Sequence, residues 1–187
     1  MVRPIAVIVA AILLSRPEMP VEEAQHFAKA LGAVAKEHHF DPLTGVAMVH
    51  FESGWLPHVV SENGEDYGLG QIRARYIGAC RNDEDPLKDP SGECKAVKKS
   101  LLDAETNLNA MGQLISDNRK LCKAKTGTAW FSQWLASYQG KNHPRENRWC
   151  KADEGTHRVI RYRLHLINTV VHKRKTPKSA PKEQPKK

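Results

Sequence analysis

The clearest hydrophobic pattern runs from residue 21 to residue 38. Apolar side chains recur there at intervals of three and four residues, the spacing of one face of an α-helix. The apolar positions are Ala24, Phe27, Ala28, Leu31, Val34 and Ala35. This segment is predicted to be an amphipathic helix that covers a core.

A second helix is predicted directly after the first. Asp41 precedes Pro42, which matches a helix N-cap followed by proline at the first helical position. Gly54 is suited to end the helix, because glycine readily adopts the left-handed conformation found there. Glu52 would then lie in the last turn. The apolar pattern of this helix is carried by Leu43, Val46, Ala47 and Val49.

The rest of the chain predicts more helix and little strand. Residues 58–72 are rich in Gly, Asn and Ser with short β-branched pieces, which favours a loop with a small β-hairpin. A polar insertion follows at 82–92. Residues 20–172 are therefore predicted to form one mainly α domain with a small β-hairpin region. Further helical patterns cover residues 100–118, 128–138 and 153–172.

The N-terminal segment resembles a signal peptide. Arg3 precedes an apolar run at residues 5–14, which suits the core of a signal peptide and is too short to span a membrane as a helix. Residues 15–18 contain no clear cleavage site. We predict that residues 1–19 are a signal peptide or an apolar N-terminal segment. The alternative is a buried N-terminal helix.

The four cysteines also favour export. None of them forms a Cys-x-x-Cys pair, so a zinc or redox site is not indicated. Two disulfides fit an oxidising compartment, periplasmic or extracellular. Three connectivities are possible. The pairing we favour closes a Pro- and Asp-rich loop with Cys80–Cys94 and ties two helices together with Cys122–Cys150. The alternative is four reduced, buried thiols.

The net charge of +8 is concentrated at the C-terminal end. Residues 173–187 contain seven Lys or Arg and one Glu, which accounts for six of the eight net charges. The body has no basic stripe interleaved with aromatics, so nucleic-acid binding is not predicted. The tail is too polar to fold and is predicted to be disordered. It would contact anionic wall polymers or lipid head groups, or serve as a solubilising segment.

Glu52 is the candidate general acid. It stands between Phe51 and Ser53, close to Trp55 and one turn from Met48. Apolar neighbours disfavour the carboxylate, and so does the negative end of the helix dipole, so both raise the pKa of Glu52. A raised pKa is what a general acid needs at neutral pH. The pentapeptide alone is not specific, because a glutamate at a helix end is usually a surface charge.

The segment that follows makes the signal specific. Glu52-Ser53 is followed by Ser61 and by the run Gly-Leu-Gly-Gln-Ile at residues 68–72. This order resembles the soluble lytic transglycosylase family, the bacterial relatives of goose-type lysozyme. The resemblance spans residues 21–140. Two later motifs match the same family, one formed by Asn107, Leu108 and Gly112 and the other by Trp134, Ala136, Tyr138 and Gly140.

The chain departs from the family pattern at several points. Gly70 stands where Met is common, and Gln139 stands where Asn is usual. Glu65 and Asp66 lengthen the central loop. The insertion that carries Cys80 and Cys94, and the segment after His143, fall outside the resemblance.

The resemblance implies a lysozyme-like fold whose helices and small hairpin line a glycan-binding groove. It also implies a reaction. Glu52 protonates the glycosidic oxygen between N-acetylmuramic acid and N-acetylglucosamine, and then accepts the proton of the C6 hydroxyl as that oxygen attacks C1, which yields a 1,6-anhydro sugar. Ser61 and Gln71 would bind the sugar, Gly68 would let it approach, and Tyr138 would point its hydroxyl at Glu52. The implied binding residues are Ser53, Ser61, Gly68, Leu69, Gln71 and Tyr138.

Three nearby carboxylates leave the reaction type open. Glu62, Glu65 and Asp66 follow the catalytic helix, and ordinary glycosidases need a second carboxylate besides the acid. If one of them faces Glu52, a hydrolytic goose-type lysozyme or a chitinase becomes the better interpretation. Otherwise these residues form a solvated acidic turn.

The remaining predictions concern partners and cofactors. The nine histidines show no zinc-site spacing, and no phosphate-binding glycine loop is present, so no metal or cofactor is predicted. The expected partner is the glycan strand of peptidoglycan, bound by a monomer, with a secretion or conjugation machine as a further candidate. A wall-binding assembly module without catalysis is the alternative from a different functional class.

Overall fold

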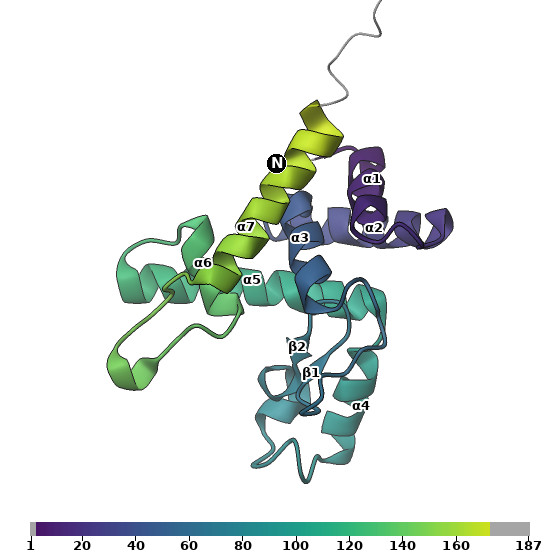
Figure 1. Cartoon of the computed structure of the whole chain (residues 1–187). Helices are drawn as coiled ribbons and strands as arrows, with labels where there is room; N and C mark the ends of the chain where they lie inside the picture. Colours follow the sequence, from purple (N-terminus) through teal and green to yellow (C-terminus); the bar gives the residue numbers. More distant parts are fainter. Residues whose placement is uncertain (1–2, 173–187) are drawn as a thin grey trace, which may run out of the picture.

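Helix α3 (Pro42–Glu52) lies at the centre of the fold. The computed structural model describes residues 3–172, and in it α3 is packed by α1 (Ile5–Ser15), α2 (Val21–Glu37) and α7 (Glu154–Leu166) (Figure 1). Every residue of α3 from Pro42 to Val49 is buried. A helix that is apolar on all sides needs such neighbours, because it has no face to turn to water.

Helix α5 (Ala104–Thr126) crosses below the helices packed around α3 and connects them to the remaining elements of the fold. It packs against α2 on one side and against α6 (Phe131–Tyr138) on the other. Helix α6 in turn packs on α7, which a π-helical stretch, η4 (Ile167–His172), continues. The predicted helices at 21–38, from Pro42, at 128–138 and at 153–172 are confirmed, with shifts of a few residues at their ends.

The predicted hairpin is confirmed as a two-stranded antiparallel sheet. Strands β1 (Asp66–Tyr67) and β2 (Ile72–Arg73) pair so that Asp66 faces Arg73. Two short 3₁₀ helices follow, η1 (Ala74–Tyr76) and η2 (Gly78–Arg81), and then α4 (Gly92–Ser100). Together these elements form a lobe that extends from one side of α5 (Figure 1).

Helix α4 was not predicted. The helix predicted at residues 100–118 is present, but it begins and ends later in the chain than predicted. The chain instead forms α4 up to Ser100 and starts α5 at Ala104. Among the residues of α4 only Cys94 is buried, so the segment lacks the apolar periodicity that identifies a helix. Its start is fixed by Ser91, whose hydroxyl accepts a hydrogen bond from the Cys94 amide at 3.1 Å, and by the Cys80–Cys94 disulfide.

The favoured disulfide pairing is confirmed among the described residues. Cys80 bonds Cys94, and Cys122 bonds Cys150. The second disulfide was expected to tie two helices together, and this detail is wrong. Cys122 lies in α5, but Cys150 lies at a bend in the loop before α7, with φ +54°. Two disulfides fit an oxidising environment of the kind found outside the cytoplasm.

The N-terminal segment forms helix α1, which is packed into the core. Val7, Ile8, Ala11 and Ile12 are buried against α2 and α3, as the alternative of a buried N-terminal helix expects. Its removal as a signal peptide stays a prediction. Within residues 3–172 no helix is both long and apolar enough to cross a membrane. The predicted basic tail lies outside the described residues.

Asp41 connects three helices at the start of α3. Its side chain caps α3 by accepting a hydrogen bond from the Leu43 amide at 3.1 Å. It also accepts two hydrogen bonds from Arg3 at 2.7 Å and one from Arg163 at 3.0 Å. Burial alone would raise the pKa of Asp41, but the hydrogen bonds from Arg3 and Leu43 outweigh it and lower that pKa. Since Arg3 precedes α1 and Arg163 lies in α7, one carboxylate holds these helices around α3.

Replacing Asp41 should therefore cost more than the loss of a helix cap. We expect Asp41→Ala to lower the free energy of unfolding by about 3 kcal/mol, because it leaves two arginines without their partner. Asp103→Ala is the matched control, since Asp103 caps α5 from an exposed position through Thr106 alone. It should cost about 1 kcal/mol. Urea unfolding measures both, and equal losses would show that the arginine contacts contribute nothing.

Candidate active site

Glu52 is the last residue of α3, in the turn where the helix leaves the core. Residues 42–49 are buried, His50 is half-buried and Phe51 is exposed, whereas Glu52 is partly buried and borders a groove. The helix stops because Gly54 adopts a left-handed conformation with φ +60°. Trp55 then turns back into the core, where its ring stacks on Phe27 with 5.8 Å between ring centroids. The chain therefore presents the Glu52 carboxyl at a fixed point.

The groove has a volume of about 870 Å³ and is lined by three parts of the chain. This size lies within the range of ligand-binding clefts. The hairpin wall is formed by Asp66, Gln71, Arg73 and Tyr76. The floor is formed by Leu114, Asn118 and Leu121 of α5. The disulfide wall, taken here as residues 137–150, contributes Ser137, Tyr138, Gln139, Gly140, Asn142, Pro144 and Trp149.

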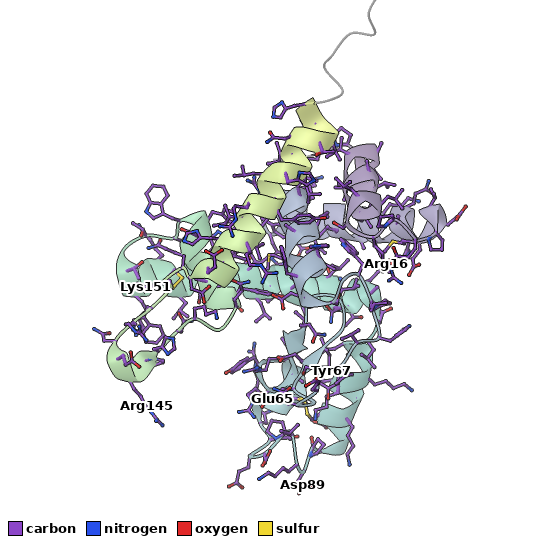
Figure 2. The ribbon with its side chains drawn as sticks, viewed as in Figure 1. Arg16, Glu65, Tyr67, Asp89, Arg145 and Lys151 are labelled. Carbon is purple, nitrogen blue, oxygen red and sulfur yellow. A yellow bond between two sulfur atoms is a disulfide. The ribbon has the colours of Figure 1, made fainter. Side chains whose placement is uncertain are left out.

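The two walls extend from the same side of α5. Figure 2 shows Glu65 and Tyr67 on the lobe that carries the hairpin wall, and Arg145 at the tip of the disulfide wall. The lining is mixed, with amide, hydroxyl and charged groups beside aromatic rings and leucines. Such a lining suits a ligand that is rich in hydroxyl and amide groups.

The carboxyl of Glu52 has a pKa raised to about 7. Burial is the largest cause, and the negative charge of Asp66 adds to it. At neutral pH the group is therefore close to half protonated, so it can both give and take a proton. The apolar neighbours of α3 were predicted to have this effect, whereas the contribution of Asp66 depends on the fold.

Asp66 is the one member of the acidic turn that lines the groove with Glu52. Its two carboxylate oxygens accept hydrogen bonds from Arg73 across the β1–β2 pair, at 2.9 and 3.1 Å. Glu65 accepts a hydrogen bond from Arg75 at 2.7 Å and borders a different, much smaller cavity. Glu62 is exposed in the turn before β1. Glu65 and Asp66 thus share an ion pair with Arg73, but of the three candidates for a second carboxylate only Asp66 lines the groove.

Tyr138 connects the two walls. Its hydroxyl donates a hydrogen bond to the backbone carbonyl of Gly70 at 2.8 Å. Burial raises the pKa of Tyr138 well above its usual value, and the charges of Glu52 and Asp66 raise it further. The tyrosine therefore stays protonated, in the same electrostatic environment as Glu52. A Cβ at Gly70 would lie 3.0 Å from the Tyr138 hydroxyl oxygen.

Asn107 holds the turn between β1 and β2 from below. Its side chain accepts a hydrogen bond from the Gly70 amide and donates to the carbonyls of Tyr67 and Leu101, all at 2.7 Å. Gly68 adopts φ +67°, and a Cβ there would lie 2.4 Å from the Asn107 amide nitrogen. The sequence identified Asn107 as part of a motif but gave it no role. Its role is to fix the backbone that receives Tyr138.

The other predicted binding residues are only partly at the groove. Gln71 lines it, with φ +45° and its side-chain amide donating to the carbonyl of Gly68 at 3.0 Å. Ser61 instead stabilises the turn, donating to the Asn63 side chain at 2.7 Å. Leu69 and Ser53 are buried. Ser53, Ser61, Gly68 and Leu69 are not among the described residues that line the groove.

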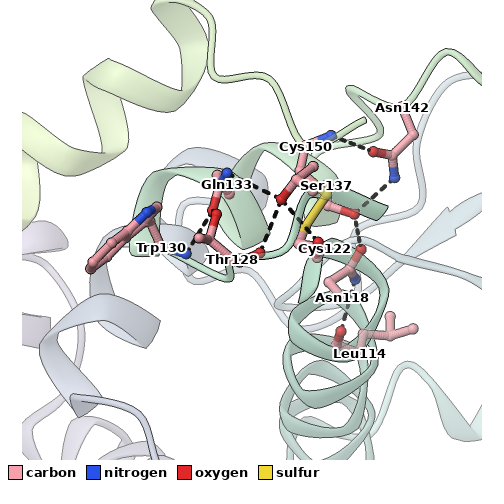
Figure 3. The surroundings of a disulfide bond; sticks show 10 residues. Leu114, Asn118, Cys122, Thr128, Trp130, Gln133, Ser137, Asn142 and Cys150 are labelled. Carbon is pink, nitrogen blue, oxygen red and sulfur yellow. Dashed lines mark hydrogen bonds between the residues drawn. A yellow bond between two sulfur atoms is a disulfide. The ribbon is translucent and has the colours of Figure 1, made fainter. Parts of the chain in front are cut away.

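Sequence reasoning missed the polar residues of the disulfide wall. The Cys150 amide donates to Asn142 at 2.9 Å, and Asn142 donates to the Ser137 hydroxyl at 2.8 Å. Ser137 donates to Asn118 of the floor (Figure 3). No local signal could have found this chain of hydrogen bonds, since its members are brought together by the Cys122–Cys150 disulfide. Within residues 3–172 no group of three His, Cys, Asp or Glu is placed to hold a metal ion.

The raised pKa of Glu52 should be measurable without any substrate. The folded protein keeps the Glu52 proton up to about pH 7, whereas an unfolded chain releases it near the ordinary value of 4.5. Ionising Glu52 in the fold therefore costs stability as the pH rises towards 8. We expect Glu52→Gln to gain about 2 to 3 kcal/mol relative to the wild type between pH 5 and pH 8.

Urea unfolding at both pH values measures this gain, with Glu84→Gln as the control. Glu84 is exposed, so its replacement should leave the difference between the two pH values unchanged. A Glu52→Gln difference that is equal at pH 5 and pH 8 would refute the raised pKa.

Comparisons with models of protein families, with characterised proteins and with solved structures found no match to this chain. The likeness to lytic transglycosylases thus rests on the sequence motifs.

Proposed function

We propose that the protein is a lytic transglycosylase of lysozyme-like fold that cleaves the glycan strands of peptidoglycan, with Glu52 as its catalytic acid. One observation carries the proposal. A carboxyl group with a pKa of about 7 stands at the end of a buried helix and borders a large groove of mixed polar and apolar lining. Buried acids at the edge of a cleft are typical of glycosidases.

The pKa of Glu52 suits both proton transfers of the proposed reaction. The protonated acid gives its proton to the glycosidic oxygen between N-acetylmuramic acid and N-acetylglucosamine as the bond from C1 to that oxygen breaks. The C6 hydroxyl oxygen of the same muramic acid then attacks C1, and its proton passes to the Glu52 carboxylate. Glu52 is thereby returned to its protonated form, and the product is a 1,6-anhydro sugar formed without water.

Asp66 has an electrostatic role in this reaction. Arg73 occupies both of its oxygens, so the carboxylate is held as a fixed negative charge. This charge raises the pKa of Glu52. It would also favour the positive charge that develops at C1 in the transition state.

A hydrolytic lysozyme is the second candidate, and the position of Asp66 favours it. Hydrolysis needs a second carboxylate to attack the sugar or to activate water. Asp66 borders the same groove as Glu52. Its engagement with Arg73 weakens it as a nucleophile or base, which is why we place the transglycosylase first.

The two disulfides agree with a site of action outside the cytoplasm, where peptidoglycan is found. We propose a periplasmic or extracellular enzyme that acts as a monomer. A secretion or conjugation machine that needs a local opening in the wall is a candidate partner.

The products distinguish the candidates. Purified protein is incubated with peptidoglycan, and the released fragments are analysed by mass spectrometry. We expect anhydro-muropeptides from the wild type and from Glu84→Gln, and at least about a hundredfold less from Glu52→Gln. Reducing-end muropeptides would support a lysozyme, and release from chitin alone would support a chitinase. Binding to the wall without any release would refute both enzymatic proposals.

The pH dependence tests the roles of Glu52 and Asp66 together. We expect kcat/KM to fall as the pH rises through about 7, because Glu52 loses the proton that it must donate. Asp66→Asn removes a negative charge from the groove, while Arg73 keeps its ion pair with Glu65 at 3.5 Å, and the loss of the Asp66 charge lowers the pKa of Glu52. The alkaline fall should therefore move to lower pH, while the anhydro product persists at acidic pH. A loss of about a hundredfold at every pH would instead indicate that Asp66 takes part directly, as hydrolysis requires.

A further inference from the structure

Trp149 is the only one of the four tryptophans that lines the groove. Trp55 and Trp134 are buried in the core. Trp130 is 69% exposed at the start of α6, where its ring points away from the Cys122–Cys150 disulfide (Figure 3). Trp149 is half-buried and borders the groove on the disulfide wall. An aromatic ring at the edge of a polar cleft needs an explanation, because burial in the core would remove more of it from water.

Two contacts fix the orientation of the Trp149 ring. Its indole N–H donates a hydrogen bond to the Asn147 side chain at 3.2 Å. The ammonium of Lys125, from the end of α5, lies over the ring at 4.6 Å from its centroid. The ring is thus held before any ligand arrives, which reduces the entropy that binding would cost. With Lys125 over one face, a ligand would use the other.

The backbone that carries Trp149 is also anchored. Cys150 follows it directly and is bonded to Cys122 of α5. Lys141 pairs with Asp153 at 2.8 Å, and backbone hydrogen bonds join His143 to Arg148 in both directions. Asn142 connects Cys150 to the floor of the groove, as described above. The disulfide wall is therefore built to hold its lining residues in place.

We propose that Trp149 is the platform of a saccharide subsite, on which one pyranose ring of the β-1,4 glycan strand stacks. A pyranose presents a face of C–H groups that packs against an aromatic face, while its hydroxyl and N-acetyl groups point outward. Asn142 and Asn118 also line the groove, and each side-chain amide has a second N–H beyond the one it donates within the fold, which can bind these groups. Trp149 binds the strand away from the bond that Glu52 cleaves. The inference rests on the proposed function, since it takes the glycan as the ligand.

The experiment measures binding separately from cleavage. Soluble peptidoglycan strands freed of their peptides are titrated into the Glu52→Gln protein, and binding is followed by calorimetry. We expect Trp149→Ala to raise Kd about tenfold, and Trp149→Phe, which keeps an aromatic face, to stay within about threefold of its parent. Trp130→Ala is the matched control and should not change Kd, because it removes an exposed tryptophan outside the groove.

A second measurement keeps the test decisive if Trp149→Ala fails to fold. Stacking of a sugar on Trp149 should change the tryptophan fluorescence of the Glu52→Gln protein. This change should be lost in Trp149→Phe and retained in Trp130→Phe.

The outcomes separate this inference from the proposed function. Equal binding by the folded Trp149→Ala and Trp130→Ala proteins, or a fluorescence change that survives Trp149→Phe, would overturn the subsite. Cleavage that depends on Glu52 would stand all the same. Conversely, binding that depends on Trp149 in a protein that releases no fragments would establish the subsite and refute the enzymatic proposal.

Discussion

The burial of α3 on every side is the constraint on which the site depends. Helices α1, α2 and α7 pack around it, and Asp41 fixes its start by bonding Arg3 and Arg163. A helix enclosed in this way can neither rotate nor slide, because the interior has no free volume to accept the change. Its last residue therefore emerges at one place only. Glu52 owes both its position and its raised pKa to the same packing.

Helix α5 plays the corresponding role for the groove. Asn107 near its start holds the turn that leads to Gly70, and Asn118 further along holds Ser137 of the disulfide wall. One rigid helix thus sets the separation of the two walls, and the Tyr138 hydroxyl closes the contact between them at Gly70. The Cys122–Cys150 disulfide adds a covalent link at the far end of α5. The groove is thus preorganised by α5 and by its contacts with both walls.

This arrangement has a cost in stability. A carboxyl group that would ionise freely in water is kept partly buried beside the negative charge of Asp66. Ionised Glu52 therefore opposes folding at alkaline pH, and the packing of α3 must outweigh it. Such local destabilisation is common at functional sites, where the surrounding structure holds a side chain in a state that is unfavourable for that side chain by itself. In the proposed reaction the same burial and negative charge raise the pKa of Glu52, so that it acts as an acid near neutral pH.

The sequence by itself determined the elements with a strong local signal. Apolar spacing identified α2, the pair Asp41-Pro42 identified the start of α3, and motif order singled out Glu52 and Tyr138. It did not determine α4, whose single buried residue, Cys94, gives no periodicity. Only the tertiary structure decided which of Glu62, Glu65 and Asp66 borders the groove, and that Trp149 and Asn142 do so as well. Asp66 is placed at the groove by its cross-strand pairing with Arg73. Trp149 and Asn142 are placed there by a disulfide between cysteines that are 28 positions apart in the chain. Local sequence patterns carry no information about such contacts, because the contacts result from packing between segments distant in sequence.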